Sequence, residues 1–163
     1  MALALRYGWA LRGQRAGGQA PVNRGKHATL LAALTQTGLL ASMTIEGAAN
    51  TEAFLLYLDE LLCPALRTGQ TVRMDNLSVH KAEAVRQRIE ACGCRLVFLP
   101  RYSPDFNPIE GAFSKLKGFL RRVQARTREA LEAALGAGLQ TITAQDAHGW
   151  FKHCGYSQTA QPS

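Results

Sequence analysis

The spacing of apolar residues changes along the chain, and each spacing predicts a different element of secondary structure. Two apolar runs, residues 27–34 and 39–45, flank a short polar turn and predict an antiparallel hairpin. Helical spacing follows, with a cap at Asn50 or Thr51 and an end at Pro64. The apolar residues expected to face the core from that helix are Phe54, Leu55, Leu58, Leu61 and Leu62.

Strand-like and helix-like segments then alternate towards the end of the chain, which is typical of a single α/β domain. Short strands are expected at residues 7–11, 71–74 and 95–99, and helices at 79–92, 128–139 and 144–153. Another helix begins at Pro108, and its core stripe has the period of an α-helix. That stripe consists of Ile109, Phe113, Leu116, Leu120 and Val123.

The composition is that of one globular domain. With 163 residues, the chain is long enough for a sizeable core and short for two domains. Hydrophobic residues make up 47% and charged residues 19%, which argues against a disordered chain. The apolar runs are far shorter than the roughly 18 residues of a membrane span, so no segment is expected to cross a bilayer. Four irregularly spaced cysteines argue against a secreted disulfide framework and favour a reducing cytoplasm.

Basic residues outnumber acidic ones by 19 to 12, and the net charge of +7 favours a polyanionic partner such as nucleic acid. The excess is concentrated between Glu110 and Glu129, where no acid occurs. We interpret this segment as one continuous positive surface, although runs of like charge also occur on helix faces that are only solvated. Its basic residues are Lys115, Lys117, Arg121, Arg122, Arg126 and Arg128.

Two acidic residues, Asp75 and Glu110, stand where chemistry is expected in an α/β fold. Asp75 follows the strand at 71–74, at the sheet edge where ligands usually bind, although an ordinary turn residue would also occur there. Glu110 lies in the first turn of the helix after the next strand, where a capping box with Asn107 would explain it equally well. If strands 71–74 and 95–99 are neighbours, both carboxylates approach the same sheet edge.

Paired carboxylates at one sheet edge suit Mg²⁺ or Mn²⁺, because these ions prefer oxygen ligands and complete their shell with water and phosphate oxygens. Two such ions about 3.5 to 4 Å apart would activate the attacking oxygen and stabilise the leaving oxygen in phosphodiester cleavage or transfer. The pair of acids therefore predicts a metal-dependent reaction on nucleic acid.

Basic side chains near both acids are candidates for binding the DNA backbone. The helix that carries Glu110 places Lys117 and Arg121 on the same face, beside its apolar stripe. His80 and Lys81 follow closely after Asp75 and could touch phosphate or face solvent.

Residues 74–81 (MDNLSVHK) and 98–110 (FLPRYSPDFNPIE) resemble the signature of DDE transposases of the bacterial insertion-sequence branch related to the mariner elements. The 34 residues between the two acids equal the separation for which this branch is known. The resemblance continues upstream at residues 6–10 (RYGWA) and downstream at Lys115 and Lys117, and it covers most of the chain.

The resemblance implies an RNase H-like domain at residues 1–155, a mixed sheet flanked by helices and lacking its first strand, with a polar tail at 156–163. In this family three acids hold two metal ions, and Asp75 matches the second acid and Glu110 the third. The first acid, an aspartate ahead of the Tyr-Gly-Trp segment, has no counterpart, because the first acid of this chain is Glu46. DNA contacts are expected from His80, Lys81, Lys115, Lys117, Arg121 and Arg122.

Two functional hypotheses follow from this resemblance. The first is the C-terminal catalytic part of a DDE transposase, which cleaves and transfers DNA strands with Mg²⁺ or Mn²⁺ but is inactive alone without its first aspartate. The chain would then be a truncated copy or the downstream frame of a frameshifted transposase. The second is a non-catalytic DNA-binding remnant that pairs with an intact transposase and modulates it. Both hypotheses predict double-stranded DNA and other transposase chains as partners, in the bacterial cytoplasm.

Overall fold

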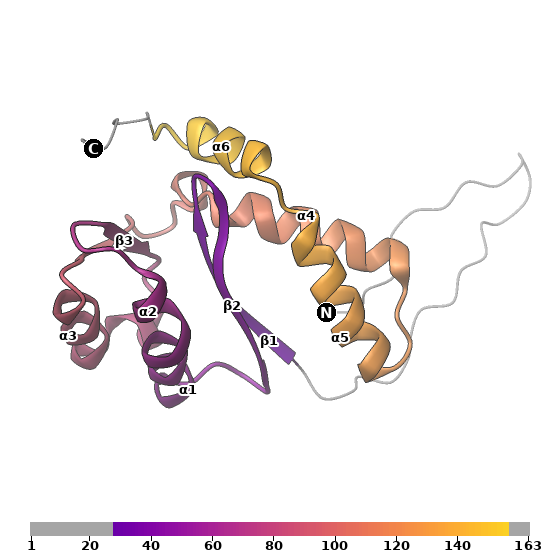
Figure 1. Cartoon of the computed structure of the whole chain (residues 1–163), viewed down its shortest axis with the longest axis horizontal. Coiled ribbons are helices and arrows are strands. Elements are labelled where there is room, and N and C mark those ends of the chain that lie inside the picture. Colours follow the sequence, from indigo (N-terminus) through magenta and orange to yellow (C-terminus); the bar gives the residue numbers. More distant parts are fainter. Residues whose placement is uncertain (1–27, 157–163) are drawn as a thin grey trace, which may run out of the picture.

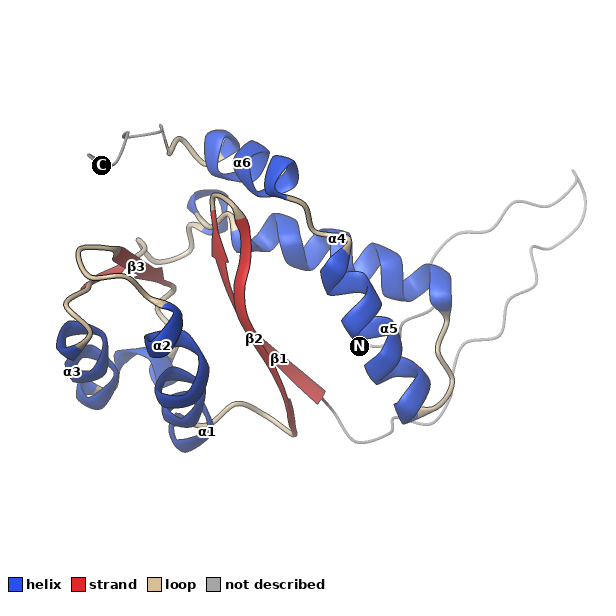
Figure 2. Cartoon of the chain, in the orientation of Figure 1, coloured by secondary structure: helices blue, strands red, loops and turns tan. Residues whose placement is uncertain are grey.

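Two pairs of β-strands and the helices that cover them make up the computed structural model, which describes residues 28–156 (Figure 1, Figure 2). Antiparallel and parallel pairing both occur among the described strands, which confirms the mixed α/β class. The strand expected at 7–11, the segment 6–10 of the resemblance and the expected tail after Tyr156 lie outside the described residues. No helix in the described part is long and apolar enough to cross a membrane.

The first pair of strands is the expected antiparallel hairpin, with β1 at Ala28–Thr35 and β2 at Gly38–Glu46. Gly38 has a φ of +127° at the turn, a conformation that glycine adopts without the steric cost of a Cβ atom. The hydroxyl of Thr35 donates to the Gly38 carbonyl at 3.0 Å and closes the turn. The hairpin prediction is therefore confirmed.

A continuous helical segment follows, from α1 (Thr51–Tyr57) through the π-type turn η1 (Leu58–Leu62) to the short α2 (Cys63–Ala65). Asn50 caps this segment, because its side-chain oxygen accepts the backbone N–H of Ala53 at 2.8 Å. Of the two caps that the sequence allows, the structure uses Asn50.

Two details of this helical segment correct the sequence prediction. Pro64 lies within α2, and the helical segment ends one residue after it, at Ala65. Leu61 is 37% exposed, although helical spacing placed it in the core. The π-type turn η1 accommodates more residues per turn and shifts the phase of the helix, so Leu58 and Leu62 take the buried positions.

The second pair of strands is parallel, with β3 at Thr71–Met74 and β4 at Arg95–Phe98. Thr71 lies opposite Arg95 and Met74 opposite Phe98, so the carboxyl ends of the two strands coincide. The expectation that these strands are neighbours is confirmed.

The helix between β3 and β4 starts later than predicted. α3 spans Glu83–Ala91, and the four residues before Ala82 form the separate 3-10 turn η2 (Ser78–Lys81). Ala82 lies between these two elements in an extended conformation, with a ψ of 133°, and separates them. His80 and Lys81 consequently belong to a turn beside the sheet edge and not to the helix that periodicity predicted.

Three helices complete the described fold, α4 (Ile109–Val123), α5 (Arg128–Gln140) and α6 (Ala144–His153), and all three were predicted. The core stripe of α4 is shifted, because Val123 is 47% exposed. Gln124 directly after it adopts the left-handed conformation that ends many helices, so the last turn leaves the core. The fully buried residues of α4 are Ala112, Leu116 and Leu120.

The hairpin β1–β2 lies between α1 and α2 on one side and α4 and α5 on the other (Figure 1). It packs against a hydrophobic cluster on each side. On one side, Leu31 packs against the cluster that α1, η1, α3 and β3–β4 form around Leu58. On the other side, Leu30 packs against the smaller cluster that α4 and α5 form around Leu120. Residues on both faces of β1 are half-buried by these contacts, which accounts for the lack of polar alternation in its apolar run.

Candidate active site

Asp75 is positioned by the pairing of β3 with β4. The last residue of β3, Met74, accepts the backbone N–H of Leu99 at 2.8 Å. Asn76, on the other side of Asp75, donates from its side-chain nitrogen to the Leu99 carbonyl. Asp75 therefore stands at the carboxyl edge of the parallel pair, where ligands commonly bind in α/β sheets.

The Asp75 carboxylate is held through one of its two oxygens. Oδ1 accepts the backbone N–H of Leu77 at 3.0 Å and lies 2.7 Å from Nδ1 of His80. The ring of His80 lies 4.5 Å from the ring of Phe54, and only 16% of its side chain is exposed, against 44% for Asp75. Oδ2 has no hydrogen-bond partner among the described residues, so it is available to a ligand.

His80 was expected to touch DNA phosphate or to face solvent, and the structure gives its ring a partner in Asp75. Its ring is mostly buried between Phe54 and Asp75, and its Nδ1 is used by the carboxylate. A side chain enclosed in this way orients its partner and presents little surface to a polyanion. Lys81, the next residue, is exposed and remains a candidate contact.

Glu110 lies in the first turn of α4 and is exposed. No side chain caps the N-terminus of α4, and the backbone N–H of Glu110 is bonded instead to the Asn107 carbonyl at 3.1 Å. Among residues 28–156, the Glu110 carboxylate has no hydrogen-bond or ion-pair partner. The capping box that could have explained this residue is therefore not formed.

One cleft of about 190 Å³ is lined by both acids. Asp75 enters it from the end of β3, and Glu110 from the start of α4. The loop between β4 and α4 forms the rest of the wall. The remaining lining residues are Asn76, Leu99, Pro100, Arg101, Tyr102, Ser103, Pro104 and Asn107.

The donor chemistry of this cleft suits a hard divalent cation. Glu110 contributes a carboxylate without a partner and Asp75 a free oxygen, and Mg²⁺ is often bound by one or two carboxylates together with water or phosphate. The described residues contain no group of three or more His, Cys, Asp or Glu side chains that could hold a metal. Within residues 28–156 the cleft therefore offers two carboxylates, and other oxygen ligands must complete the shell.

The exposed face of α4 continues from Glu110 to Lys117 and then to Arg121, which is half-buried. Lys117, Arg121 and the exposed Arg122 form no ion pair among the described residues. Unpaired cations at the surface keep their full charge for a polyanionic partner. Lys117 and Arg121 lie on one side of the helix and are named the basic face of α4, with Arg122 about 100° around the helix from Arg121.

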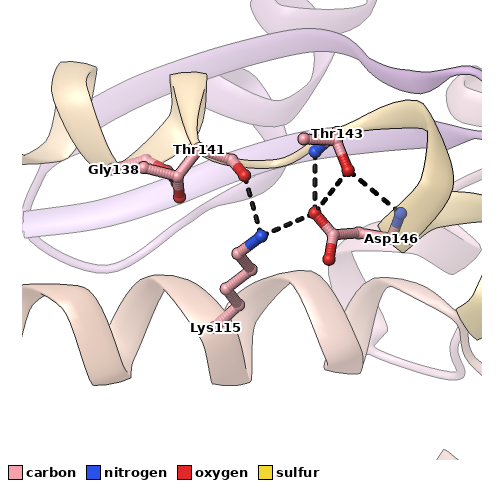
Figure 3. Close-up of polar contacts among 5 residues, drawn as sticks. All are labelled: Lys115, Gly138, Thr141, Thr143 and Asp146. Carbon is pink, nitrogen blue, oxygen red and sulfur yellow. Dashed lines mark hydrogen bonds and ion pairs between the residues drawn. The ribbon is translucent and has the colours of Figure 1, made fainter.

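Lys115 does not belong to that face, which corrects the expected continuous surface (Figure 3). Its Nζ donates to Oδ2 of Asp146 at 2.6 Å and to the carbonyl of Thr141 at 2.8 Å. The bond from Lys115, followed by those from Thr143, lowers the pKa of Asp146 from 3.8 to about 2. Lys115 consequently joins α4 to the start of α6, and we assign it a structural role.

Two further contacts hold α6 against the candidate site. A Cβ atom at Gly111 would lie only 2.5 Å from the Trp150 ring, so helix α6 approaches α4 directly beside Glu110. Tyr156, expected to begin the polar tail, donates its hydroxyl to the Phe106 carbonyl at 2.6 Å and packs its ring on Arg73. Neither the contact of Trp150 with Gly111 nor the contacts of Tyr156 were predicted from the sequence. The capping box of α6, with Thr143 and Asp146, was the one signal that could have revealed part of them.

Glu46, the first acid of the sequence, lies at the end of β2 and accepts Nη1 of Arg128 at 2.8 Å. It is not among the residues that line the cleft. Arg128 also bonds Glu132, and both carboxylates raise the pKa of its guanidinium. Arg128 is therefore not a free cation of the positive surface predicted between Glu110 and Glu129. Glu46 is not placed to act with Asp75.

Comparisons with known proteins identify the family and the fold of this chain. Residues 2–132 match the sequence profile of the DDE superfamily endonuclease family. A solved structure with a similar fold is the Mos1 transposase paired-end complex with left transposon end, with a TM-score of 0.76 and 21% identity. That match covers 91% of this chain and 47% of the other. No curated protein sequence matches.

Two other solved structures give the same result. The Mos1 mariner paired end complex with Mn has a TM-score of 0.75 and 22% identity over 93% of this chain and 48% of that chain. The Mos1 strand transfer complex has a TM-score of 0.74 and 23% identity over 92% and 47%. The chain thus spans about half the length of these transposases, and it shares their RNase H-like fold. Because the profile covers well over half of the residues, the chain belongs to the DDE superfamily endonuclease family.

Proposed function

We propose that this chain is the catalytic part of a DNA transposase of the insertion-sequence branch related to the mariner elements. The observation that carries the proposal is the cleft shared by Asp75 and Glu110, at the carboxyl edge of a parallel strand pair. The likeness to Mos1 complexes with transposon ends supports DNA as the substrate, and the basic face of α4 beside Glu110 supplies matching charge.

Asp75 and Glu110 would hold a divalent cation, Mg²⁺ or Mn²⁺, which supplies Lewis-acid stabilisation of phosphate oxygens when bound. Leu77 and His80 keep one oxygen of Asp75 engaged, so the other oxygen is oriented for this task. Lys117, Arg121 and Arg122 would bind phosphates of the flanking duplex and fix its register along α4.

Metal binding is tested by titrating the protein with Mn²⁺ in a calorimeter. We expect Asp75→Asn and Glu110→Gln each to lower the affinity by more than about tenfold, the loss typical of removing even an outer partner of a metal site. Glu83→Gln is the matched control, because Glu83 is an exposed acid at the start of α3, outside the cleft. Equal affinity for all four proteins would reject the site.

DNA binding is tested by the dependence of duplex affinity on salt, because released counterions give a slope of about −0.9 per neutralised phosphate. Lys117→Ala and Arg121→Ala should each reduce the magnitude of the slope by about one. Arg86→Ala is the control, since Arg86 pairs with Glu90 on α3. A slope that neither α4 variant changes would exclude the basic face of α4.

We further propose that residues 1–163 do not cleave DNA alone. Two-metal catalysis clamps both the attacking and the leaving oxygen, and this cleft contains two acids among the described residues. Incubation with supercoiled plasmid and Mn²⁺ should leave the plasmid intact. Nicking that Asp75→Asn abolishes would show that another acid completes the site.

A second candidate function is a non-catalytic partner of an intact transposase. The observation that favours it is the basic face of α4, whose cations form no ion pair in the described part of the chain and whose binding to DNA needs neither acid. In that case Asp75→Asn would leave duplex affinity unchanged. Adding this chain to an active transposase would change the rate at which that transposase transfers DNA strands.

A further inference from the structure

Tyr102, on the loop between β4 and η3 (Pro104–Phe106), combines two unfavourable features. Its side chain is 100% exposed, and its φ is +58°, in the left-handed region that bulky residues rarely adopt. Among the described non-glycine residues, Gln124 also has a positive φ, but it ends α4, where this conformation is ordinary. Tyr102 has no helix to end, so its conformation needs another explanation.

The loop that carries Tyr102 is held at both ends. At one end, Asn76 donates to the Leu99 carbonyl and links the loop to β3. At the other end, the carbonyl of Phe106 accepts the Tyr156 hydroxyl at 2.6 Å and links the loop to the end of α6. Local backbone strain persists only where the surrounding structure over-determines it, and such residues cluster at ligand sites. The tip at Tyr102 is therefore presented from a fixed frame.

Tyr102 also lies at the wall of the cleft that contains Asp75 and Glu110. The neighbouring Arg101 is exposed and lines the same cleft. A strand whose phosphodiester group reaches the two acids must consequently pass an uncovered aromatic ring and a cation. This is the combination by which proteins hold single-stranded nucleic acid, with bases stacked on aromatic rings and phosphates near basic groups.

We propose that Tyr102 is a stacking platform for an unpaired base of the DNA strand that enters the cleft, and that Arg101 binds a neighbouring phosphate. The inference rests on the proposed function, because it takes DNA as the ligand. A base within a duplex is already stacked on both faces, so the ring of Tyr102 selects DNA with an unpaired nucleotide over fully paired DNA.

The test compares two oligonucleotides at fixed salt, a blunt duplex and the same duplex with a short single-stranded end that carries 2-aminopurine. For the wild-type chain, we expect tighter binding of the second DNA and quenching of its fluorescence. Tyr102→Ala should lower affinity for that DNA by roughly 5- to 150-fold, the range that stacking of one base supplies. Affinity for the blunt duplex should be unchanged, and Tyr102→Phe should behave as wild type because stacking does not need the hydroxyl.

Tyr102→Gly separates stacking from loop structure. Glycine adopts a positive φ without strain, so this variant should resist urea better than wild type and still bind the unpaired end as weakly as Tyr102→Ala. If either variant binds both DNAs as tightly as wild type does, the stacking role is refuted while DNA binding stands. If the wild-type chain binds neither DNA, the proposed function itself fails, and this inference fails with it.

Discussion

The contact between α4 and α6 beside Glu110 yields a prediction that two glycines of one helix can test. In α4, a Cβ atom at Gly111 would lie 2.5 Å from Cδ1 and 2.6 Å from Cγ of Trp150, whereas a Cβ at Gly118 would meet nothing within 4 Å. Cγ is fixed close to the backbone of α6, so the ring cannot avoid the new methyl group by a small rotation. Gly111→Ala must displace α6, and Gly118→Ala need displace nothing.

The magnitudes follow from two opposing effects. Replacing glycine by alanine within a helix stabilises it by up to about 1 kcal/mol. Forcing an extra carbon into a packed contact costs about 1 to 3 kcal/mol. Gly118→Ala should therefore raise the free energy of unfolding by up to about 1 kcal/mol, and Gly111→Ala should be less stable than Gly118→Ala by about 1 to 3 kcal/mol. In a chain of this size, each kcal/mol corresponds to roughly 2 to 4 °C in Tm.

Urea unfolding followed by circular dichroism measures both variants. The control is a third protein, Trp150→Ala, in which Gly111→Ala should become stabilising because the obstructing ring is gone. Since α6 packs beside Glu110, Gly111→Ala should also weaken Mn²⁺ binding, whereas Gly118→Ala should not. If Gly111→Ala stabilised the wild-type chain as much as Gly118→Ala does, the packing of Trp150 on α4 would be refuted.

Three further predictions use the same assays. Because the pKa of Asp146 is lowered to about 2, its ion pair stabilises the fold above about pH 4 and is lost as the pH falls through 2. Lys115→Met should therefore flatten the decline in urea midpoint between pH 5 and pH 2, and a decline as steep as that of wild type would contradict the role of the pair. Gly138→Ala should be less stable than Gly118→Ala by about 1 to 3 kcal/mol, because its Cβ would lie 2.6 Å from a leucine methyl group of α4, and equal stability of the two variants would contradict this packing. His80→Ala should lower Mn²⁺ affinity by about 10- to 100-fold by releasing Oδ1 of Asp75, and His80→Asn should restore much of it. Unchanged affinity in His80→Ala would remove the positioning role.

Local patterns in the sequence were sufficient for most elements of secondary structure. The hairpin, the two short strands and the helices α4, α5 and α6 were predicted because their apolar spacing, caps and turns act over a few residues. The sequence left the pairing of β3 with β4 as a condition for bringing the two acids to one sheet edge, and the structure shows that pairing.

The errors arose where irregular turns, helix ends and side-chain hydrogen bonds override the apolar periodicity. Leu61 and Val123 have the spacing of core residues, but the π-type turn η1 and the left-handed end of α4 turn them outwards. The start of α3 moved because the Asp75 carboxylate binds both Leu77 and His80 and so stabilises a turn. Periodicity contains no information about such side-chain partners.

The sequence by itself determined the class of the protein, the two acids and the basic character of α4, since these depend on residue type and spacing. Only the tertiary structure decided which charges are available. Lys115 and Asp146 are 31 residues apart in the chain and neutralise each other, whereas Lys117, two positions from Lys115, has no ion-pair partner within residues 28–156. The physical reason is that the availability of a charge depends on its neighbours in space, and the packing of α6 on α4 brings those neighbours together.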